Sequence, residues 1–245
     1  MPSPTFSIII PAIRVEADIA GCLESIRRQT CTDYEVLVMD GGSTDRTVEL
    51  VSNQAGEFGG RLLLRSEKDD GVYDAMNKGI RLARGEWLYF LGADDVLHDP
   101  QVLEKVAAFI VSQPGSQLVY GDVIMRSSSR RYDGPFDLAK LLLEKNICHQ
   151  AIFYRRTVFE KIGHYNLRYR IWADWDLNIR CFQHPAFINR HLDFVVADYN
   201  DIKGISMVED PELKKLLPTC LLRKVSIRKL LRLKTANLWR KITQT

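Results

Sequence analysis

Carboxylate side chains follow three of the four apolar, strand-like segments in the first 95 residues. Asp40 ends the second segment, Asp69 lies in the loop after the third, and Asp94 and Asp95 follow the fourth. Each of these residues alone fits a solvated turn or a helix cap. Because the carboxyl ends of parallel strands meet at one edge of a sheet, we expect the four side chains to lie close together. Like charges gathered at one edge indicate a bound cation or polar ligand.

Adjacent carboxylates after a strand suit Mg²⁺ or Mn²⁺, which proteins hold through one or two Asp and through substrate phosphates. The common phosphate-binding loops are absent from the sequence. It contains no GxxxxGK[ST] motif, and Pro11-Ala12-Ile13-Arg14 stands where a dinucleotide-binding fold carries GxGxxG after its first strand. The carboxylate cluster therefore predicts a nucleoside diphosphate whose charge is bridged by a divalent metal ion.

Four short apolar runs predict the strands that position these side chains. The runs lie at residues 6–11, 35–40, 61–65 and 87–91, and residues with helical spacing separate them. This alternation predicts βα units and an α/β fold class, with a mostly parallel, Rossmann-like central sheet flanked by helices.

The regular alternation fades after residue 95. We expect strands at residues 118–120 and 194–197, and helices near residues 100–113, 137–145, 156–162 and 173–182. The simplest organisation is one domain over residues 1–210 and a basic helical tail over residues 211–245. Within the domain, residues 1–95 form a nucleotide-binding half and residues 96–210 an acceptor half.

The composition is that of an ordinary soluble globular protein, with 46% hydrophobic and 27% charged residues in a chain of 245. Its five cysteines are scattered without a CxxC pair, which argues against structural zinc and a disulfide framework and indicates a reducing cytosol. No apolar stretch approaches the roughly 18 residues of a membrane span. We expect no secretory signal, because the first residues lack a basic lead followed by a long apolar run.

Charge divides the chain into an acidic body and a basic tail. Ten of the 34 Lys and Arg residues lie in residues 214–245, which hold no acidic residue, so residues 1–213 carry 24 basic against 31 acidic residues. An acidic body without a basic stripe argues against a nucleic-acid partner. Each Lys or Arg near an anionic leaflet contributes about 1 kcal/mol, so we expect the tail to bind an anionic membrane surface. A solvated basic tail fits the same charge pattern.

Seven motifs stand in the order found in a known family: SIIIP at 7–11, CLESIRRQT at 22–30, EVLVMDGGSTDRT at 35–47, SEKDDGVYDAMNKGI at 66–80, ARGEWLYFLGADD at 83–95, HQAIFYRR at 149–156 and ADWDLNIR at 173–180. On these motifs the chain, from Phe6 to Ser206, resembles the family 2 glycosyltransferases, and most closely the bacterial enzymes that build exopolysaccharide, capsule or lipopolysaccharide units. The resemblance implies a GT-A fold. It also implies a metal-dependent, inverting transfer of a sugar from a nucleoside-diphosphate sugar to a hydroxyl of a saccharide acceptor. A lipid-linked acceptor, which the resemblance favours, would place the enzyme peripherally on the cytoplasmic face of the inner (plasma) membrane.

The resemblance also implies roles for individual residues. Asp95 would hold the metal ion, and Asp174 in the ADWD motif would be the catalytic base. The residues assigned to the nucleotide are Pro11 and Glu16 along the pocket, Asp40 and Asp69 at the base, Asn77 and Lys78 at the pocket's border, and Asp94 near the ribose.

A carboxylate suits the removal of a proton from an attacking hydroxyl, and Asp176 rivals Asp174 for this role. Positions i and i+2 lie on different helix faces, so only one of the two points at the acceptor. Both also fit acids that the dipole favours at a helix N-terminus. We expect His149, Gln150 and Trp175 to contact the acceptor, although a buried histidine and a core aromatic fit these positions too.

The sequence departs from the family pattern at two places. Ala12-Ile13 replaces an aromatic-Asn pair after the first strand, and Ala173 replaces an acidic residue before the expected base.

Two other functions fit part of the sequence. A sugar nucleotidyltransferase needs a glycine-rich basic loop after the first strand, and residues 11–18 hold no glycine, which argues against it. A non-catalytic membrane-surface module acting through the basic tail leaves the carboxylate cluster unexplained.

Overall fold

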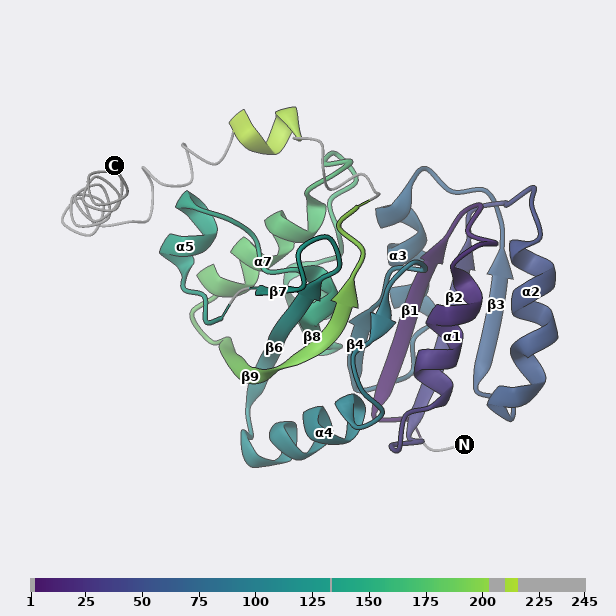
Figure 1. Ribbon diagram of the computed structural model, residues 1–245. Coiled ribbons are helices and arrows are strands. Elements are labelled where there is room, and N and C mark those ends of the chain that lie inside the picture. Colours follow the sequence, from purple (N-terminus) through teal and green to yellow (C-terminus); the bar gives the residue numbers. More distant parts are fainter. Residues whose placement is uncertain (1–2, 133, 203–209, 216–245) are drawn as a thin grey trace.

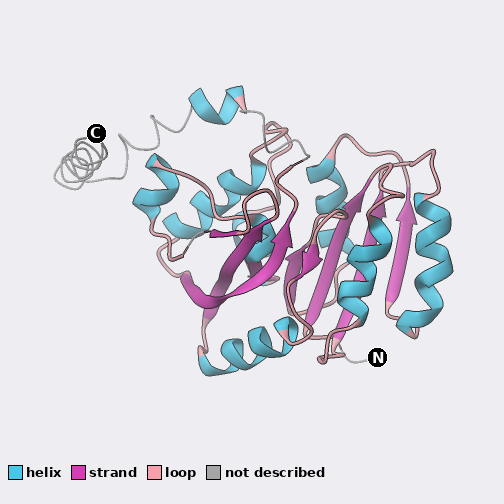
Figure 2. Cartoon of the chain, viewed as in Figure 1, coloured by secondary structure: helices cyan, strands magenta, loops and turns pink. Residues whose placement is uncertain are grey.

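The computed structural model describes residues 3–132, 134–202 and 210–215. Most of the expected basic tail therefore lies outside the described residues, although residues 211–215 are helical. In the described part of the chain, no helix combines the length and the apolar character that crossing a membrane requires. One sheet runs through the described chain, with helices packed against it (Figure 1; Figure 2).

The first 90 residues form a parallel βα array, as the sequence predicts. All four predicted strands are confirmed to within one residue at either end. The strands are β1 (Phe6–Ala12), β2 (Tyr34–Asp40), β3 (Leu62–Ser66) and β4 (Trp87–Phe90). The helices between them are α1 (Ile19–Arg27), α2 (Thr47–Gln54), the short 3₁₀ helix η1 (Ala55–Phe58) and α3 (Val72–Leu82).

The rest of the chain contains more strands than the sequence predicts. Its strands are β5 (Val96–Leu97), β6 (Ser116–Met125), β7 (Arg130–Tyr132), β8 (Ile152–Arg155) and β9 (Ile188–Tyr199). Its helices are α4 (Val102–Ser112), α5 (Leu138–Leu143), the 3₁₀ helix η2 (His149–Ala151), α6 (Thr157–Ile162) and α7 (Ala173–Gln183). The four predicted helices are confirmed. The predicted strands at 118–120 and 194–197 are the middle of β6 and the end of β9, and β5, β7 and β8 were not predicted.

The strands follow the order β3-β2-β1-β4-β8-β6-β9-β5, with β7 paired to β6. The longest ladders are parallel, namely β1 with β2 and β6 with β9. β8 lies between β4 and β6 and is antiparallel to both. β8 thereby joins the parallel nucleotide-side array to the later strands, and the carboxyl end of β4 lies next to segments from the second half of the chain.

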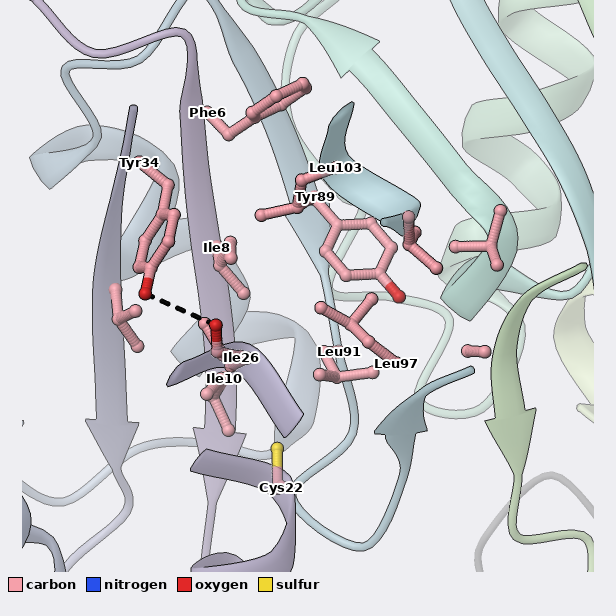
Figure 3. Close-up of a cluster of buried hydrophobic side chains, with 14 of the residues drawn as sticks. Phe6, Ile8, Ile10, Cys22, Ile26, Tyr34, Tyr89, Leu91, Leu97 and Leu103 are labelled. Atoms are coloured by element: carbon pink, nitrogen blue, oxygen red, sulfur yellow. Dashed lines mark hydrogen bonds between the residues drawn. The ribbon is translucent and has the colours of Figure 1, made fainter. Parts of the chain in front are cut away.

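β1 is buried on both faces, which explains its unbroken apolar sequence. Ile8 and Ile10 point to one face and pack in the same cluster as Ile26 of α1 and Tyr34 of β2, as Figure 3 shows. Ile9 points to the other face and packs in a second cluster with α3. Burying one such isoleucine contributes about 1.5–3 kcal/mol, so β1 anchors the helices on both sides of the sheet.

A buried polar network stabilises the end of the sheet at which the strands β1 and β4 begin. The Glu35 carboxylate is 4% exposed and accepts hydrogen bonds from the Ser7 hydroxyl at 2.7 Å and the Arg84 backbone N–H at 2.6 Å. The Gly85 N–H donates to Ser7 Oγ at 2.8 Å. A Cβ on Gly85 would lie 2.5 Å from the Ser7 backbone nitrogen, so only glycine allows this approach.

We expect Gly85→Ala to lower the free energy of unfolding by about 1–3 kcal/mol, because the added methyl group meets backbone atoms that cannot rotate away. Gly21→Ala is the matched control. Gly21 lies exposed in α1, where a Cβ meets nothing within 4 Å, so helix propensity should raise stability by up to about 1 kcal/mol. Urea denaturation of both variants measures the difference, and equal stabilities would contradict the close approach at Ser7.

Candidate active site

Asp95 is a buried carboxylate that joins three segments at the carboxyl end of β4. Its side chain is 1% exposed. One oxygen accepts the Asn200 backbone N–H at 2.7 Å, and the other accepts the Gln150 side-chain amide at 2.7 Å. Burial raises the pKa of Asp95 to about 6, although these hydrogen bonds favour the ionised form. Asp95 thus fixes the β4 loop against η2 and the end of β9.

Asp94 lies beside it but is only half-buried. Its Oδ2 accepts the Asn200 side-chain amide at 3.1 Å, and its carbonyl accepts the Arg126 guanidinium at 2.9 Å. Burial, together with the nearby Asp18 carboxylate, raises the pKa of Asp94. Of the two adjacent carboxylates, Asp94 is the one with surface left for a ligand.

Asp174 occupies the second position of α7, where the helix N-terminus favours an anion. Its side chain is 8% exposed. Oδ1 lies 2.7 Å from the Tyr73 hydroxyl, and Oδ2 accepts the Asn146 amide at 2.6 Å. Burial raises the pKa of Asp174, while the nearby His149 and the Tyr73 hydrogen bond act to lower it. A desolvated carboxylate with a raised pKa is suited to accept a proton.

His149 lies near both carboxylate regions. It is in η2, next to Gln150, and the charges of Asp174 and Asp94 act to raise its pKa. Burial lowers the pKa of His149, so its imidazole is neutral at pH 7. The structure therefore brings Asp94, Asp95, His149 and Asp174 to the same end of the sheet, as the sequence predicts for the carboxylates after β4.

The Asp40 carboxylate lies at the end of β2 and organises the turn that follows it. It is 2% exposed and accepts the Gly42 and Ser43 N–H groups at 3.1 Å each, and the Ser66 hydroxyl at 2.6 Å. The Asp69 carboxylate packs against this turn at Gly41, where an added Cβ would lie only 2.5 Å from Asp69 Oδ2. Asp69 is half-buried and remains open to a ligand.

The other nucleotide-side residues make bonds within the protein. Pro11 is half-buried in β1, and the Glu16 carboxylate accepts the Arg46 N–H at 2.9 Å. Asn77 exchanges two hydrogen bonds with the Tyr165 backbone, at 2.9 and 3.0 Å. The Lys78 ammonium donates to the carbonyl of the nearby Lys68 at 2.7 Å. Asn77 and Lys78 therefore tie α3 to neighbouring loops.

The acceptor-side residues differ in how available they are. Gln150 is 3% exposed, and its amide is engaged by Asp95. The Trp175 indole donates to the Leu141 carbonyl at 2.7 Å and is half-buried. Asp176, the rival of Asp174, pairs with Arg180 one turn along α7 at 2.8 Å. Asp174 faces Tyr73 and Asn146, whereas Asp176 faces an arginine.

The family model "Glycosyl transferase family 2" matches residues 7–173. The chain belongs to this family. A PGL/p-HBAD biosynthesis glycosyltransferase of Mycobacterium bovis (strain BCG / Pasteur 1173P2) is 55% identical over 219 residues, which cover 89% of this chain and 86% of the relative.

Solved glycosyltransferases share the fold. The first is S. aureus TarS 1–349 in complex with UDP-GlcNAc, with a TM-score of 0.70 and 18% identity over 91% of this chain and 68% of that chain. In the UDP complex of TarS 1–349 the match spans only 60% of that chain. The second is the mannosyltransferase PcManGT from Pyrobaculum calidifontis, in complex with GDP-Man and Mn²⁺, with a TM-score of 0.63 and 20% identity over 80% and 57% of the two chains. The expected GT-A fold is thereby confirmed.

The described residues of this glycosyltransferase contain no group of three or more His, Cys, Asp and Glu side chains that could hold a metal ion. A cation held by one carboxylate and by substrate phosphates needs no such group. Asp94 fits that second arrangement, because its carboxylate is half-buried at the strand end. Asp95 fits it less well, because each of its oxygens already accepts a short hydrogen bond.

Sequence reasoning missed four side chains that shape the site. Tyr73 and Asn146 bond the Asp174 carboxylate, Asn200 bonds both Asp94 and Asp95, and Arg126 approaches the β4 loop. Tyr73 lies in the motif at 66–80 but was assigned no role there, and the other three lie outside the seven motifs. Their roles arise from contacts between residues 28 to 106 positions apart.

We expect Gln150→Leu to lower the free energy of unfolding by about 1–3 kcal/mol at pH 8, because Asp95 loses one of its two donors. The loss should shrink toward pH 5, where Asp95, with a pKa of about 6, becomes neutral. Gln117→Leu is the control, since this buried amide bonds neutral groups and its loss should not follow pH between 5 and 8. Denaturation at both pH values measures the two slopes, and parallel behaviour would contradict the Asp95 contact.

Proposed function

We propose that the chain is an inverting transferase that moves a sugar from a nucleoside-diphosphate sugar to a hydroxyl of a saccharide acceptor. One observation carries this proposal. Asp94, a half-buried carboxylate that can hold a cation for the leaving group, and Asp174, a buried carboxylate that can accept a proton, both lie near enough to His149 to act on its pKa, at one end of the sheet. Displacement of a nucleoside diphosphate by a hydroxyl needs these two functions in one site.

In this proposal Asp174 is the general base. Its carboxylate takes the proton from the acceptor hydroxyl as that oxygen attacks the anomeric carbon from the face opposite the leaving group, which inverts the configuration. The raised pKa of Asp174 supports this role, because a base works best when its pKa approaches the working pH. The pairing of Asp176 with Arg180 supports Asp174 over its rival.

We propose that Asp94 holds Mg²⁺ or Mn²⁺ together with the phosphates of the donor. Such an ion neutralises the charge that develops on the departing diphosphate. The family resemblance gives the metal to Asp95. Because both oxygens of Asp95 accept hydrogen bonds in the protein, we instead infer that Asp95 positions the β4 loop and Asp94 meets the ion. The Mn²⁺ complex of PcManGT supports a metal-dependent reaction.

The nucleotide would lie across the carboxyl ends of β1, β2 and β4. We propose that Pro11, Glu16 and Asp69 contact it directly, and that Asp40 shapes the turn beneath its base. Asn77 and Lys78 would border the pocket by fixing α3. The UDP and UDP-GlcNAc complexes of TarS support a nucleotide-sugar donor.

The acceptor would approach from the side of η2 and α7. We propose that His149 and Trp175 contact it, and that Gln150 acts through Asp95. A relative named as a PGL/p-HBAD biosynthesis glycosyltransferase supports a biosynthetic role, and we propose that the acceptor is lipid-linked and the product a cell-surface polysaccharide. Salt-sensitive attachment of the basic residues 214–245 to the inner face of the plasma membrane would bring the enzyme to such an acceptor.

We expect Asp174→Asn to slow sugar transfer by roughly 10²–10⁴-fold while nucleotide affinity stays near that of the wild type. Asp176→Asn is the matched control on the same helix and should retain transfer to within a few-fold. A screen of nucleotide sugars identifies the donor, and initial rates with that donor then measure both variants. Loss of activity in Asp176→Asn alone would move the base two residues along α7.

We expect UDP or GDP with Mn²⁺ to raise the melting temperature by about 5–10 °C when the ligand is near 100-fold above its dissociation constant. Asp94→Asn should abolish the part of this shift that depends on Mn²⁺, because the variant loses the carboxylate that binds the ion. Asp33→Asn, at the opposite end of the sheet where it bonds Thr5, should keep the whole shift. Thermal unfolding with and without Mn²⁺ separates the two, and a full Mn²⁺ response in Asp94→Asn would refute the assignment.

A further inference from the structure

The Tyr73 hydroxyl has two acceptors within hydrogen-bond distance and one proton to donate. Its oxygen lies 2.7 Å from Asp174 Oδ1 and 2.6 Å from the Ile171 carbonyl oxygen. Tyr73 itself is 6% exposed. A phenol hydroxyl donates one hydrogen bond at a time and also accepts, so the protonation state of Asp174 decides which acceptor Tyr73 serves.

Both protonation states of Asp174 can be satisfied without moving a heavy atom. When Asp174 is ionised, the Tyr73 proton points to Oδ1, because a hydrogen bond to a charged acceptor is about twice as strong as one to a neutral carbonyl. When Asp174 carries a proton, its new O–H donates to the Tyr73 oxygen, and the Tyr73 proton turns to the Ile171 carbonyl. Each group keeps one proton in this state.

We propose that Tyr73 is a positioning residue whose hydroxyl switches between Asp174 and the Ile171 carbonyl, so that Asp174 is held in one orientation before and after it takes a proton. This inference rests on the proposed role of Asp174 as the base. In the transfer step the acceptor O–H bond breaks, its electron pair forms the glycosidic bond, and its proton forms an O–H bond on Asp174. Tyr73 neither gains nor loses a proton, and burial, which raises the pKa of Tyr73 well above its usual value, keeps it protonated throughout.

A hydrogen-bond chain holds the other oxygen of Asp174 in place. The Tyr154 hydroxyl donates to Asn178 Oδ1, the Asn178 amide donates to Asn146 Oδ1, and the Asn146 amide donates to Asp174 Oδ2, with distances between 2.6 and 2.8 Å. Every donor in this chain points toward the carboxylate. Asp174 Oδ2 thus has a fixed donor, the Asn146 amide, whereas Oδ1 has a donor that can turn, the Tyr73 hydroxyl.

The remaining titratable groups around Asp174 come from four segments. They are Tyr73 from α3, Cys148 and His149 at η2, Tyr154 from β8, and Tyr165 before α7. Burial raises the pKa of each tyrosine and of the cysteine and lowers that of the histidine, so all are neutral at pH 7. Asp174 and His149 are then the two groups in this set that can change charge below pH 7, and only Asp174 gives a carboxylic acid band.

The test is an infrared titration of the Asp174 carboxyl group in the full chain, for which no substrate is needed. The carboxylic acid band that is present in the wild type and absent from Asp174→Asn belongs to Asp174. In Tyr73→Phe the ionised form loses its donor, so the midpoint of this band should rise by about one pH unit, and the band itself should shift because the acid loses its acceptor.

Tyr34→Phe is the matched control. Tyr34 is a buried tyrosine whose hydroxyl lies near the Ile26 carbonyl in the cluster of Figure 3, and its loss should leave the Asp174 midpoint unchanged. If Tyr73→Phe does not fold, 3-fluorotyrosine placed at position 73 keeps the shape and is a stronger donor, so the midpoint should fall. An unmoved midpoint in the variant that folds would overturn the inference.

Turnover separates this inference from the proposed function. If Asp174→Asn retains transfer to within a few-fold, the base lies elsewhere, and the role of Tyr73 in catalysis is lost with it. If Asp174→Asn is crippled but the band titrates at the same pH with and without the Tyr73 hydroxyl, only the switching role is refuted. The inference is supported if Asp174→Asn is crippled and if, in Tyr73→Phe, the midpoint of the acidic limb of the pH–rate profile rises by as many pH units as the midpoint of the infrared band.

Discussion

A buried carboxylate must find hydrogen-bond donors, and this requirement at Asp95 holds the site together. Its two donors come from Gln150 and Asn200, 55 and 105 residues further along the chain. If either oxygen lacked a donor, the buried carboxylate would carry a poorly compensated charge or would stay protonated. The β4 loop, η2 and the end of β9 are therefore joined at Asp95. Asp94 and His149 are positioned by the same contacts, because they are the sequence neighbours of Asp95 and Gln150.

The neighbouring acids differ in environment, and the environment separates their functions. Asp95 is enclosed and bonded by two amide N–H groups, Asp94 is half-buried beside Arg126, and Asp174 is enclosed and bonded by the Asn146 amide and by the Tyr73 hydroxyl, which can turn. An enclosed and bonded acid fixes structure, a half-open acid can meet a ligand, and a desolvated acid with a raised pKa can accept a proton. Identical side chains thus support three roles within one site.

Sequence patterns predicted the parallel half of the fold because β1, β2 and β4 are largely apolar runs buried on both faces. β8 was not predicted because it has only four residues, which are identified as a strand by their pairing with β4 and β6. The same limit applies to the site. Motifs gave the acidic residues, whereas the roles of Tyr73, inside the motif at 66–80, and of Asn200, outside every motif, come from contacts across the fold. The proposed contacts of Asn77 and Gln150 with ligands stay predictions, and both amides bond groups within the protein.

α3 is the element through which the two halves of the site can influence each other. Tyr73 and Asn77 lie one turn apart on the same face of this helix, and they bond Asp174, the Ile171 carbonyl and the Tyr165 backbone. The loop at the start of α3 carries Asp69, which faces the nucleotide side at Gly41. The loop that carries Asp69 and the Tyr73 hydroxyl that bonds Asp174 therefore belong to one continuous element, so a single short segment serves both sides of the site.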